Sequence, residues 1–294
     1  MDRGATVTGG RWEDRWWTAA DGVWLHARDY PGPPDRPPLV CLPGLTRNAR
    51  DFHDLACRLA GAWRVVAVDF RGRGESKPAK DPTSYVPATY VADLEEMLAA
   101  LDIARFVAVG TSLGGLVTMM LAARGRERLA GAVLNDVGPQ VEAAGLQRIR
   151  GYVGRASSFP TWMHAARALA EANRDVHPGF GVEDWLAMAK RTYRLTQTGK
   201  IVLDYDLKIA EPFRTPGGAA PPDLWPALDA LRDTPVLILR GERSDVLSPA
   251  TAARMLKALP HAELVTVPAT GHAPTLSEAE AAAGMERLLA RVAP

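Results

Sequence analysis

Three residues with a fixed spacing could form the centre of a nucleophilic site: Gly110, Ser112 and Gly114. A short apolar run at 106–109 precedes them, and an apolar stretch at 116–123 follows. This pattern predicts a buried strand that turns at once into a helix. At such a turn the apex side chain points outward from a strained backbone, and flanking glycines avoid collisions. Ser112 is therefore the candidate nucleophile, next to free N–H groups at the start of a helix.

A serine hydroxyl is a weak nucleophile at neutral pH and needs a base to accept its proton. His272 follows the last expected strand, and the neighbouring Gly271 suits a loop. The other five histidines lie in an early strand, on a helix, in the middle of the chain, or before the last strand: His26, His53, His164, His177 and His261. We therefore expect His272 to be the base.

The base needs a carboxylate that holds one tautomer and stabilises the cation formed during reaction. Two aspartates follow strands on the expected binding side of the sheet, Asp136 and Asp245. We favour Asp245, because residues 241–244 give it reach. Asp136 stays open as the alternative, with a role in capping the loop behind it as its other interpretation.

Negative charge that develops on a substrate oxygen needs fixed hydrogen-bond donors. We expect two backbone N–H groups to supply them. One belongs to Leu113, directly after the candidate nucleophile, and the other to Leu45, directly after Gly44. Because the donors are main-chain groups, their side chains should matter less than the backbone that positions them.

The elements that must position these residues alternate between strand and helix. Expected strands lie at 16–19, 23–29, 39–42, 64–68, 106–109, 129–134, 235–239 and 262–267, and helices at 51–60, 90–101, 116–123, 249–259 and 277–290. Strands rich in Val and Leu predict an α/β fold with a mostly parallel central sheet and helices on both faces. Residues 139–222 break this alternation and are too long for a loop, so we expect a helical lid inserted between core parts 1–138 and 223–294.

The composition of the 294 residues is that of a soluble globular protein, with a net charge of +1. The sequence has no basic stripe of the kind that binds nucleic acid, and it has no apolar run long enough to cross a membrane. The first residues lack the apolar core of a signal peptide, so we expect a cytoplasmic protein. No Cys and His pair has zinc-ligand spacing, and we expect neither a metal nor a cofactor. The oligomeric state is left open.

Five motifs together resemble the α/β-hydrolase family, in particular its lidded, esterase-like members. They are LPGL at 42–45, DFRGRGES at 69–76, GTSLGG at 110–115, LRGERSDVLSP at 239–249 and TGHAP at 270–274. The chain order Ser, Asp, His is the order of this family. One departure is Pro43, where many relatives carry histidine before the glycine, and it alters the lining of the oxyanion loop without removing its backbone donor.

The leading hypothesis is a serine hydrolase that cleaves carboxylic esters of small to medium acyl groups through an acyl-enzyme. The alternative that uses the same three residues is a lactonase, a carbon–carbon bond hydrolase or a cyanohydrin-cleaving enzyme. A non-catalytic binding protein on this fold is the alternative of another class. Dehalogenases and epoxide hydrolases are disfavoured, since relatives of those kinds carry Asp where Ser112 stands. Five lid residues are candidates for an apolar substrate pocket: Phe159, Trp162, Met163, Trp185 and Tyr205.

Overall fold

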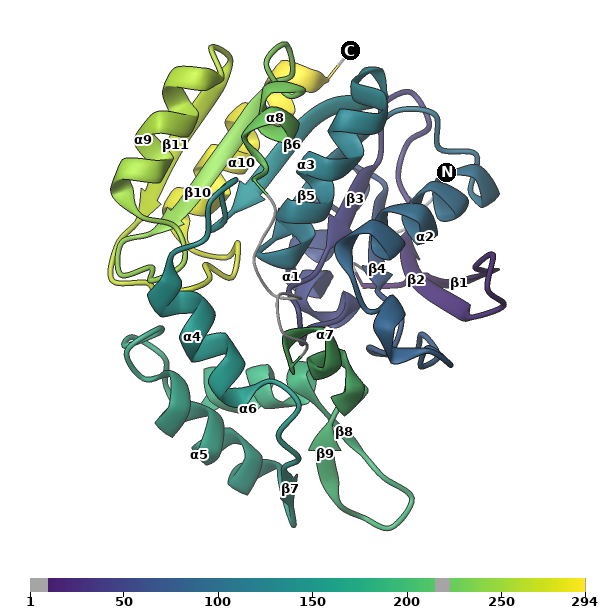
Figure 1. Cartoon of the computed structure of the whole chain (residues 1–294), viewed down its shortest axis with the longest axis vertical. Coiled ribbons are helices and arrows are strands. Elements are labelled where there is room, and N and C mark those ends of the chain that lie inside the picture. The colour runs from purple at the N-terminus through teal and green to yellow at the C-terminus, as the bar shows by residue number, and fades with distance from the viewer. Residues whose placement is uncertain (1–9, 215–222, 294) are drawn as a thin grey trace, which may run out of the picture.

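An eight-stranded sheet runs through the computed structural model, which describes residues 10–214 and 223–293 (Figure 1). The strand order is β1-β2-β4-β3-β5-β6-β10-β11. The β1–β2 and β2–β4 pairs are antiparallel, and the other neighbours in this sheet are parallel. The expected mostly parallel sheet is therefore confirmed.

From β3 onward the core alternates strands and helices in chain order. Its strands are β1 Glu13–Thr18, β2 Trp24–Tyr30, β3 Leu39–Leu42, β4 Val65–Asp69, β5 Phe106–Thr111, β6 Leu129–Asn135, β10 Val236–Gly241 and β11 Ala262–Val267. Its helices are α1 His53–Arg58, α2 Pro87–Ala100, α3 Leu113–Gly125, α8 Trp225–Asp229, α9 Pro249–Ala258 and α10 Ala279–Val292.

Successive strand residues point to opposite sides of the sheet, so both faces carry apolar side chains. Helices cover both of these faces. In β3, Val40 joins one apolar cluster and Cys41 joins the other. The first cluster takes in side chains of α2, α3, α8 and α9, and the second takes in side chains of α1 and α10. The central strands are mostly apolar for this reason, and β4 and β6 are buried at every position. Among the described residues, no helix is long and apolar enough to span a membrane.

Between β6 and β10 the chain leaves the sheet and forms a separate group of elements, called the insertion below. Its elements are α4 Ala143–Tyr152, β7 Ser158–Phe159, α5 Trp162–Asn173, α6 Val182–Thr192, β8 Tyr193–Leu195, β9 Ile201–Leu203 and α7 Glu211–Arg214. Figure 1 shows them grouped beyond one end of the sheet. The insertion is not only helical as expected, because β7, β9 and β8 form a small antiparallel sheet. The boundaries 139 and 222 stay predictions, and residues 215–222 lie outside the described part of the chain.

The insertion has an apolar cluster of its own, separate from the two that flank the sheet. Trp185 is buried in it together with small residues of α5 and α6 such as Ala166 and Ala189. Phe159 and Trp162 pack against this cluster. The aromatic residues of the insertion therefore hold its helices and small sheet together.

Candidate active site

Ser112 lies between the end of β5 and the start of α3, as the glycine spacing predicts. Its φ of 53° and ψ of −114° are a strained conformation for a residue with a side chain. The space around it explains the two glycines. A Cβ at Gly114 would lie 2.0 Å from the backbone oxygen of Leu42, and one at Gly110 would lie 2.4 Å from the backbone oxygen of Gly114. The strand and the helix can approach this closely only without side chains there.

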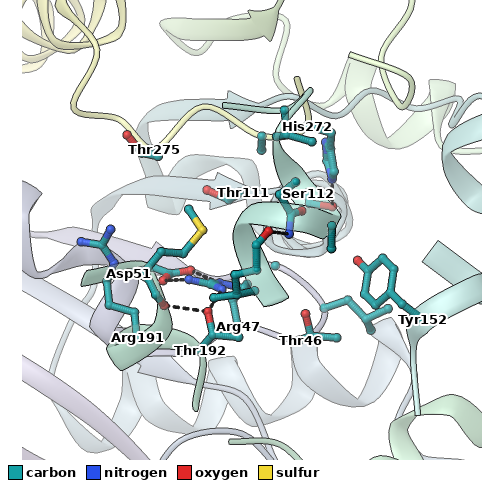
Figure 2. A pocket seen from close by; sticks show the side chains of 18 of the residues that line it. Thr46, Arg47, Asp51, Thr111, Ser112, Tyr152, Arg191, Thr192, His272 and Thr275 are labelled. Atoms are coloured by element: carbon teal, nitrogen blue, oxygen red, sulfur yellow. Dashed lines mark hydrogen bonds and ion pairs between the residues drawn. The ribbon is translucent and has the colours of Figure 1, made fainter. Parts of the chain in front are cut away.

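His272 lies in the loop between β11 and α10, and its imidazole reaches Ser112 (Figure 2). Its Nε2 is 2.9 Å from Ser112 Oγ. Next to it, the amide of Gly271 donates a hydrogen bond of 2.8 Å to the carbonyl of Val176, which belongs to the insertion. The structure thus brings together the two residues that the sequence suggested as nucleophile and base, although their roles stay predictions.

The carboxylate behind His272 is Asp136, which lies directly after β6. Its Oδ2 is 2.8 Å from His272 Nδ1, and its side chain is fully buried. It also accepts hydrogen bonds from the Gly241 amide at 2.9 Å and from Ser244 Oγ at 2.7 Å. Asp136 is therefore held from two sides while it faces the imidazole.

In the described part of the chain Asp245, the expected acid, makes no hydrogen bond with His272, so the geometry favours Asp136. Asp245 makes a bidentate ion pair with Arg148 of α4, with N–O distances of 2.6 and 2.8 Å. The Arg148 hydrogen bonds hold the pKa of the Asp245 carboxyl below its usual value. Gly241 at the end of β10 and Ser244 in the following loop donate to Asp136, whereas Asp245 of that loop pairs with Arg148 of the insertion.

The loop after β3 lies against Ser112. A Cβ at Gly44 would be 3.8 Å from the Ser112 Cβ. The Gly44 carbonyl accepts a hydrogen bond of 3.1 Å from the Arg47 amide, and the Leu45 carbonyl accepts one of 2.9 Å from Arg73 Nε. These bonds fix the peptide planes on both sides of Leu45. The amides of Leu45 and Leu113 remain the predicted oxyanion donors.

A pocket of about 480 Å³ opens over these residues (Figure 2). The core contributes the β3 loop with Ser112 and His272, and the insertion contributes Tyr152, Thr192 and Tyr205. Buried His177 also lines the pocket, and burial lowers its pKa to about 4, so the imidazole is neutral at pH 7. The cavity is therefore formed jointly by the two parts of the chain.

Of the five residues expected to line an apolar pocket, Tyr205 does so and the other four do not. Phe159, Trp162 and Trp185 belong to the interior of the insertion, and Met163 is exposed on α5. The physical reason is that the insertion needs a core of its own, and its large aromatic residues supply it.

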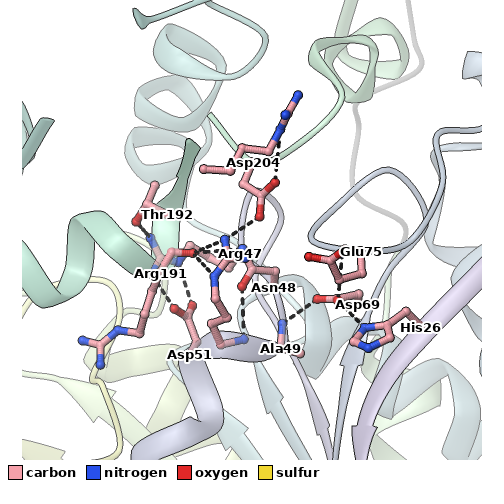
Figure 3. Close-up of polar contacts among 12 residues, drawn as sticks. His26, Arg47, Asn48, Ala49, Asp51, Asp69, Glu75, Arg191, Thr192 and Asp204 are labelled. Atoms are coloured by element: carbon pink, nitrogen blue, oxygen red, sulfur yellow. Dashed lines mark hydrogen bonds and ion pairs between the residues drawn. The ribbon is translucent and has the colours of Figure 1, made fainter. Parts of the chain in front are cut away.

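Polar contacts fasten the insertion to the loop that follows Leu45 (Figure 3). Arg47 is hydrogen-bonded to Thr192, and its Nε is 2.6 Å from Asp51. Asn48 Nδ2 and Arg50 Nη2 donate to the Arg191 carbonyl at 2.9 and 3.0 Å. The predicted oxyanion loop and the insertion are thus linked by side chains of one short segment.

Sequence reasoning missed the polar lining of the pocket. Arg47, Arg148, Arg155 and Arg191 all reach it, together with Tyr152. Arg148 and Tyr152 are four residues apart within α4, so they lie on one face of that helix, and Arg155 follows three residues after the helix ends. That periodicity was visible in the sequence. What was missing was the direction in which the helix faces.

Known proteins match the chain over most of its length. The model of the alpha/beta hydrolase family matches residues 39–284. A 3-hydroxybutyrate-oligomer hydrolase of Cupriavidus necator is 36% identical over 264 residues, which are 85% of this chain and 88% of the relative. A 2-(acetamidomethylene)succinate hydrolase of Mesorhizobium japonicum is 28% identical over 238 residues, 80% of this chain and 81% of the relative.

A solved structure is also similar over nearly the whole fold. It is an alpha/beta hydrolase from Novosphingobium aromaticivorans, with 59% sequence identity and a TM-score of 0.92 over 95% of this chain and 98% of that one. The family model spans the strands that carry Ser112, Asp136 and the β3 loop and extends past His272. From sequence and architecture alike, the chain belongs to the alpha/beta hydrolase family.

Proposed function

We propose that the protein is a serine hydrolase that cleaves carboxylic esters of small to medium acyl groups through an acyl-enzyme. The supporting observation is the unbroken line of hydrogen bonds from Ser112 Oγ to His272 Nε2 at 2.9 Å and from His272 Nδ1 to Asp136 Oδ2 at 2.8 Å. In this proposal Ser112 is the nucleophile, His272 the base and Asp136 the acid that orients it. No cofactor is needed for this reaction.

In the first half of the reaction, Ser112 Oγ attacks the ester carbonyl and its proton passes to His272 Nε2. Buried Asp136 stabilises the imidazolium without taking the proton. The tetrahedral oxyanion accepts hydrogen bonds from the Leu45 and Leu113 amides. When it collapses, the ester C–O bond breaks, the alcohol leaves with the proton from His272, and the acyl group stays on Ser112.

In the second half, His272 takes a proton from water, and the resulting hydroxide attacks the acyl carbon. Collapse of this second tetrahedral intermediate releases the carboxylic acid and returns the proton to Ser112. Both halves use the same three side chains, so removal of Ser112 stops both.

The size and lining of the pocket support a small-molecule substrate. A volume of about 480 Å³ suits an ester of short or medium chain rather than a polymer. The relative named for 3-hydroxybutyrate oligomers supports an ester substrate as well, because oligomers of a hydroxy acid are joined by ester bonds. Short 3-hydroxybutyrate oligomers are therefore candidate substrates to test first.

Cleavage of another bond by the same residues is the second candidate. The relative named as a 2-(acetamidomethylene)succinate hydrolase supports it, because that name describes a substrate other than a simple ester. A panel that contains a lactone and a vinylogous 1,5-diketone, beside simple esters, distinguishes the two candidates by which compound has the highest kcat/KM.

The proposal is tested with p-nitrophenyl acetate and butyrate on wild type and Ser112→Ala. We expect the variant to lose at least about 1000-fold in kcat. A fluorophosphonate probe should add one adduct to wild type, located on Ser112 by peptide mass spectrometry. Equal rates for the two proteins would refute the proposal, and an unlabelled wild-type protein would favour a non-catalytic binding role.

A further inference from the structure

The pocket over Ser112 is lined by more cations than carboxylates. Among the residues that the structure describes, four arginines reach it, Arg47, Arg148, Arg155 and Arg191, but only two acidic side chains do, Asp51 and Asp54. Asp51 pairs with Arg47 and Asp54 pairs with Arg191, the latter at 2.7 Å. The remaining two cations both come from α4 and the residues after it.

These two arginines differ in whether a carboxylate pairs with them. Arg148 forms an ion pair with Asp245, which does not line the pocket. Arg155 is exposed, and within residues 10–214 and 223–293 its side chain has no ion pair or hydrogen bond. Its guanidinium is thus a pocket cation without a carboxylate in the described part of the chain.

Tyr152 lies between these arginines in sequence and also lines the pocket. Figure 2 shows its hydroxyl turned toward Ser112. A phenol can donate a hydrogen bond at neutral pH, and a guanidinium presents a fork that matches both oxygens of a carboxylate. Tyr152 at the end of α4 and Arg155 just after it therefore offer a donor and a positive charge in the pocket that Ser112 and His272 also line.

We propose that the pocket selects esters that carry a free carboxylate, bound by Arg155 with Tyr152 as a second donor. This inference rests on the proposed ester hydrolysis and names its substrate class. Arg155 is exposed, so it loses little hydration when it binds, and a charge-assisted hydrogen bond stabilises the complex more than a neutral one. Arg148 lines the same pocket but is already paired with Asp245.

The test compares an ester that carries a free carboxylate with the same ester after its carboxylate is capped by a methyl group. The first pair is mono-p-nitrophenyl glutarate and its methyl ester, with the carboxylate on the acyl side. The second pair is 3-acetoxypropanoate and its methyl ester, with the carboxylate on the alcohol side. For each pair the readout is the ratio of kcat/KM for the anionic ester to that for the uncharged ester, in wild type, Arg155→Gln and Arg167→Gln. Arg167 is an exposed residue of α5 outside the pocket, so its variant removes the same charge from the same insertion.

We expect Arg155→Gln to lower this ratio about tenfold in at least one pair, mainly through KM. Arg167→Gln should leave the ratio as in wild type, and the affected pair shows which end of the ester carries the recognised carboxylate. An unchanged ratio in both pairs, or an equal fall in the two variants, would overturn the inference.

Failure of the proposed ester hydrolysis itself is recognised separately, because wild type would then cleave none of the four esters. In that case the subsite is measured by calorimetric titration of wild type and Arg155→Gln with monomethyl glutarate. A Kd about tenfold weaker for the variant supports the carboxylate subsite, and equal Kd values overturn it.

Discussion

Arg73 Nε donates a hydrogen bond of 2.9 Å to the carbonyl oxygen of Leu45, the residue whose own amide is a predicted oxyanion donor. The Arg73 side chain is almost fully buried, and its guanidinium lies 5.4 and 5.1 Å from the rings of Tyr85 and Tyr90. Burial of a guanidinium is costly unless its donors are used. We interpret this bond as a means of fixing the backbone of the predicted oxyanion loop.

Arg73→Lys tests this positioning role, because lysine keeps the charge but cannot donate from the same place. We expect kcat for p-nitrophenyl butyrate to fall about tenfold with little change in KM, since a misplaced donor affects the transition state more than substrate binding. Steady-state kinetics and a thermal melt are measured on the same sample. A lower melting temperature with an unchanged kcat would show that Arg73 has only a structural role.

Gly114→Ala should destabilise the fold, because the added Cβ would lie 2.0 Å from the backbone oxygen of Leu42 and neither backbone can move aside cheaply. Overpacking of this kind costs about 1–3 kcal/mol in the free energy of unfolding. Gly44→Ala is the matched control, because its nearest contact is the Arg47 side chain at 3.4 Å. Its change should stay within about 1 kcal/mol. Urea denaturation of both variants measures this, and equal losses would contradict the explanation.

His177 should make the protein less stable as the pH falls. Burial lowers its pKa from 6.5 to about 4, and its ring stacks on Phe180 with centroids 4.4 Å apart. Between these two pKa values the unfolded chain binds a proton that the folded chain does not. The free energy of unfolding therefore decreases as pH drops from 6.5 toward 4, and the stability contribution of the neutral ring is complete only above pH 6.5.

Urea denaturation at pH 7.5 and pH 5.0 measures this effect in wild type and His177→Phe. The drop in the free energy of unfolding should be about 2 kcal/mol larger for wild type. His26 is present in both proteins and cancels from the comparison. Although burial opposes it, pairing with Asp69 and Asp14 raises the His26 pKa, so its contribution has the opposite sign and is lost as pH rises. An equal drop in wild type and variant would contradict the assignment to His177.

The order of strands and helices could be predicted from the sequence because each element has a local signature. Apolar runs bounded by glycine and proline indicated the strands, and Gly110 and Gly114 indicated the turn at Ser112. The closeness of Ser112 and His272 also followed, since the carboxyl ends of parallel strands meet at one edge of a sheet.

The choice between Asp136 and Asp245 could not be made locally, because it depends on which strands are neighbours. In the structure Thr111 of β5 pairs with Asn135 of β6, so Ser112 and Asp136 each follow the end of adjoining strands. Asp245 lies four residues beyond β10, where it forms an ion pair with Arg148 of the insertion. The pocket lining was missed for a similar reason: the direction in which a helix face points is set by its packing partner.

The central claim is that Asp136, rather than Asp245, supports the His272 base. The most direct test is kcat for p-nitrophenyl butyrate in Asp136→Asn and Asp245→Asn, with the fold checked by circular dichroism. We predict a loss of about 10,000-fold for Asp136→Asn, because asparagine stabilises the wrong imidazole tautomer and cannot balance the cation. Asp245→Asn should lose at most about tenfold, because it weakens only a partly exposed ion pair with Arg148. A large loss in Asp245→Asn with near-normal turnover in Asp136→Asn would contradict the account.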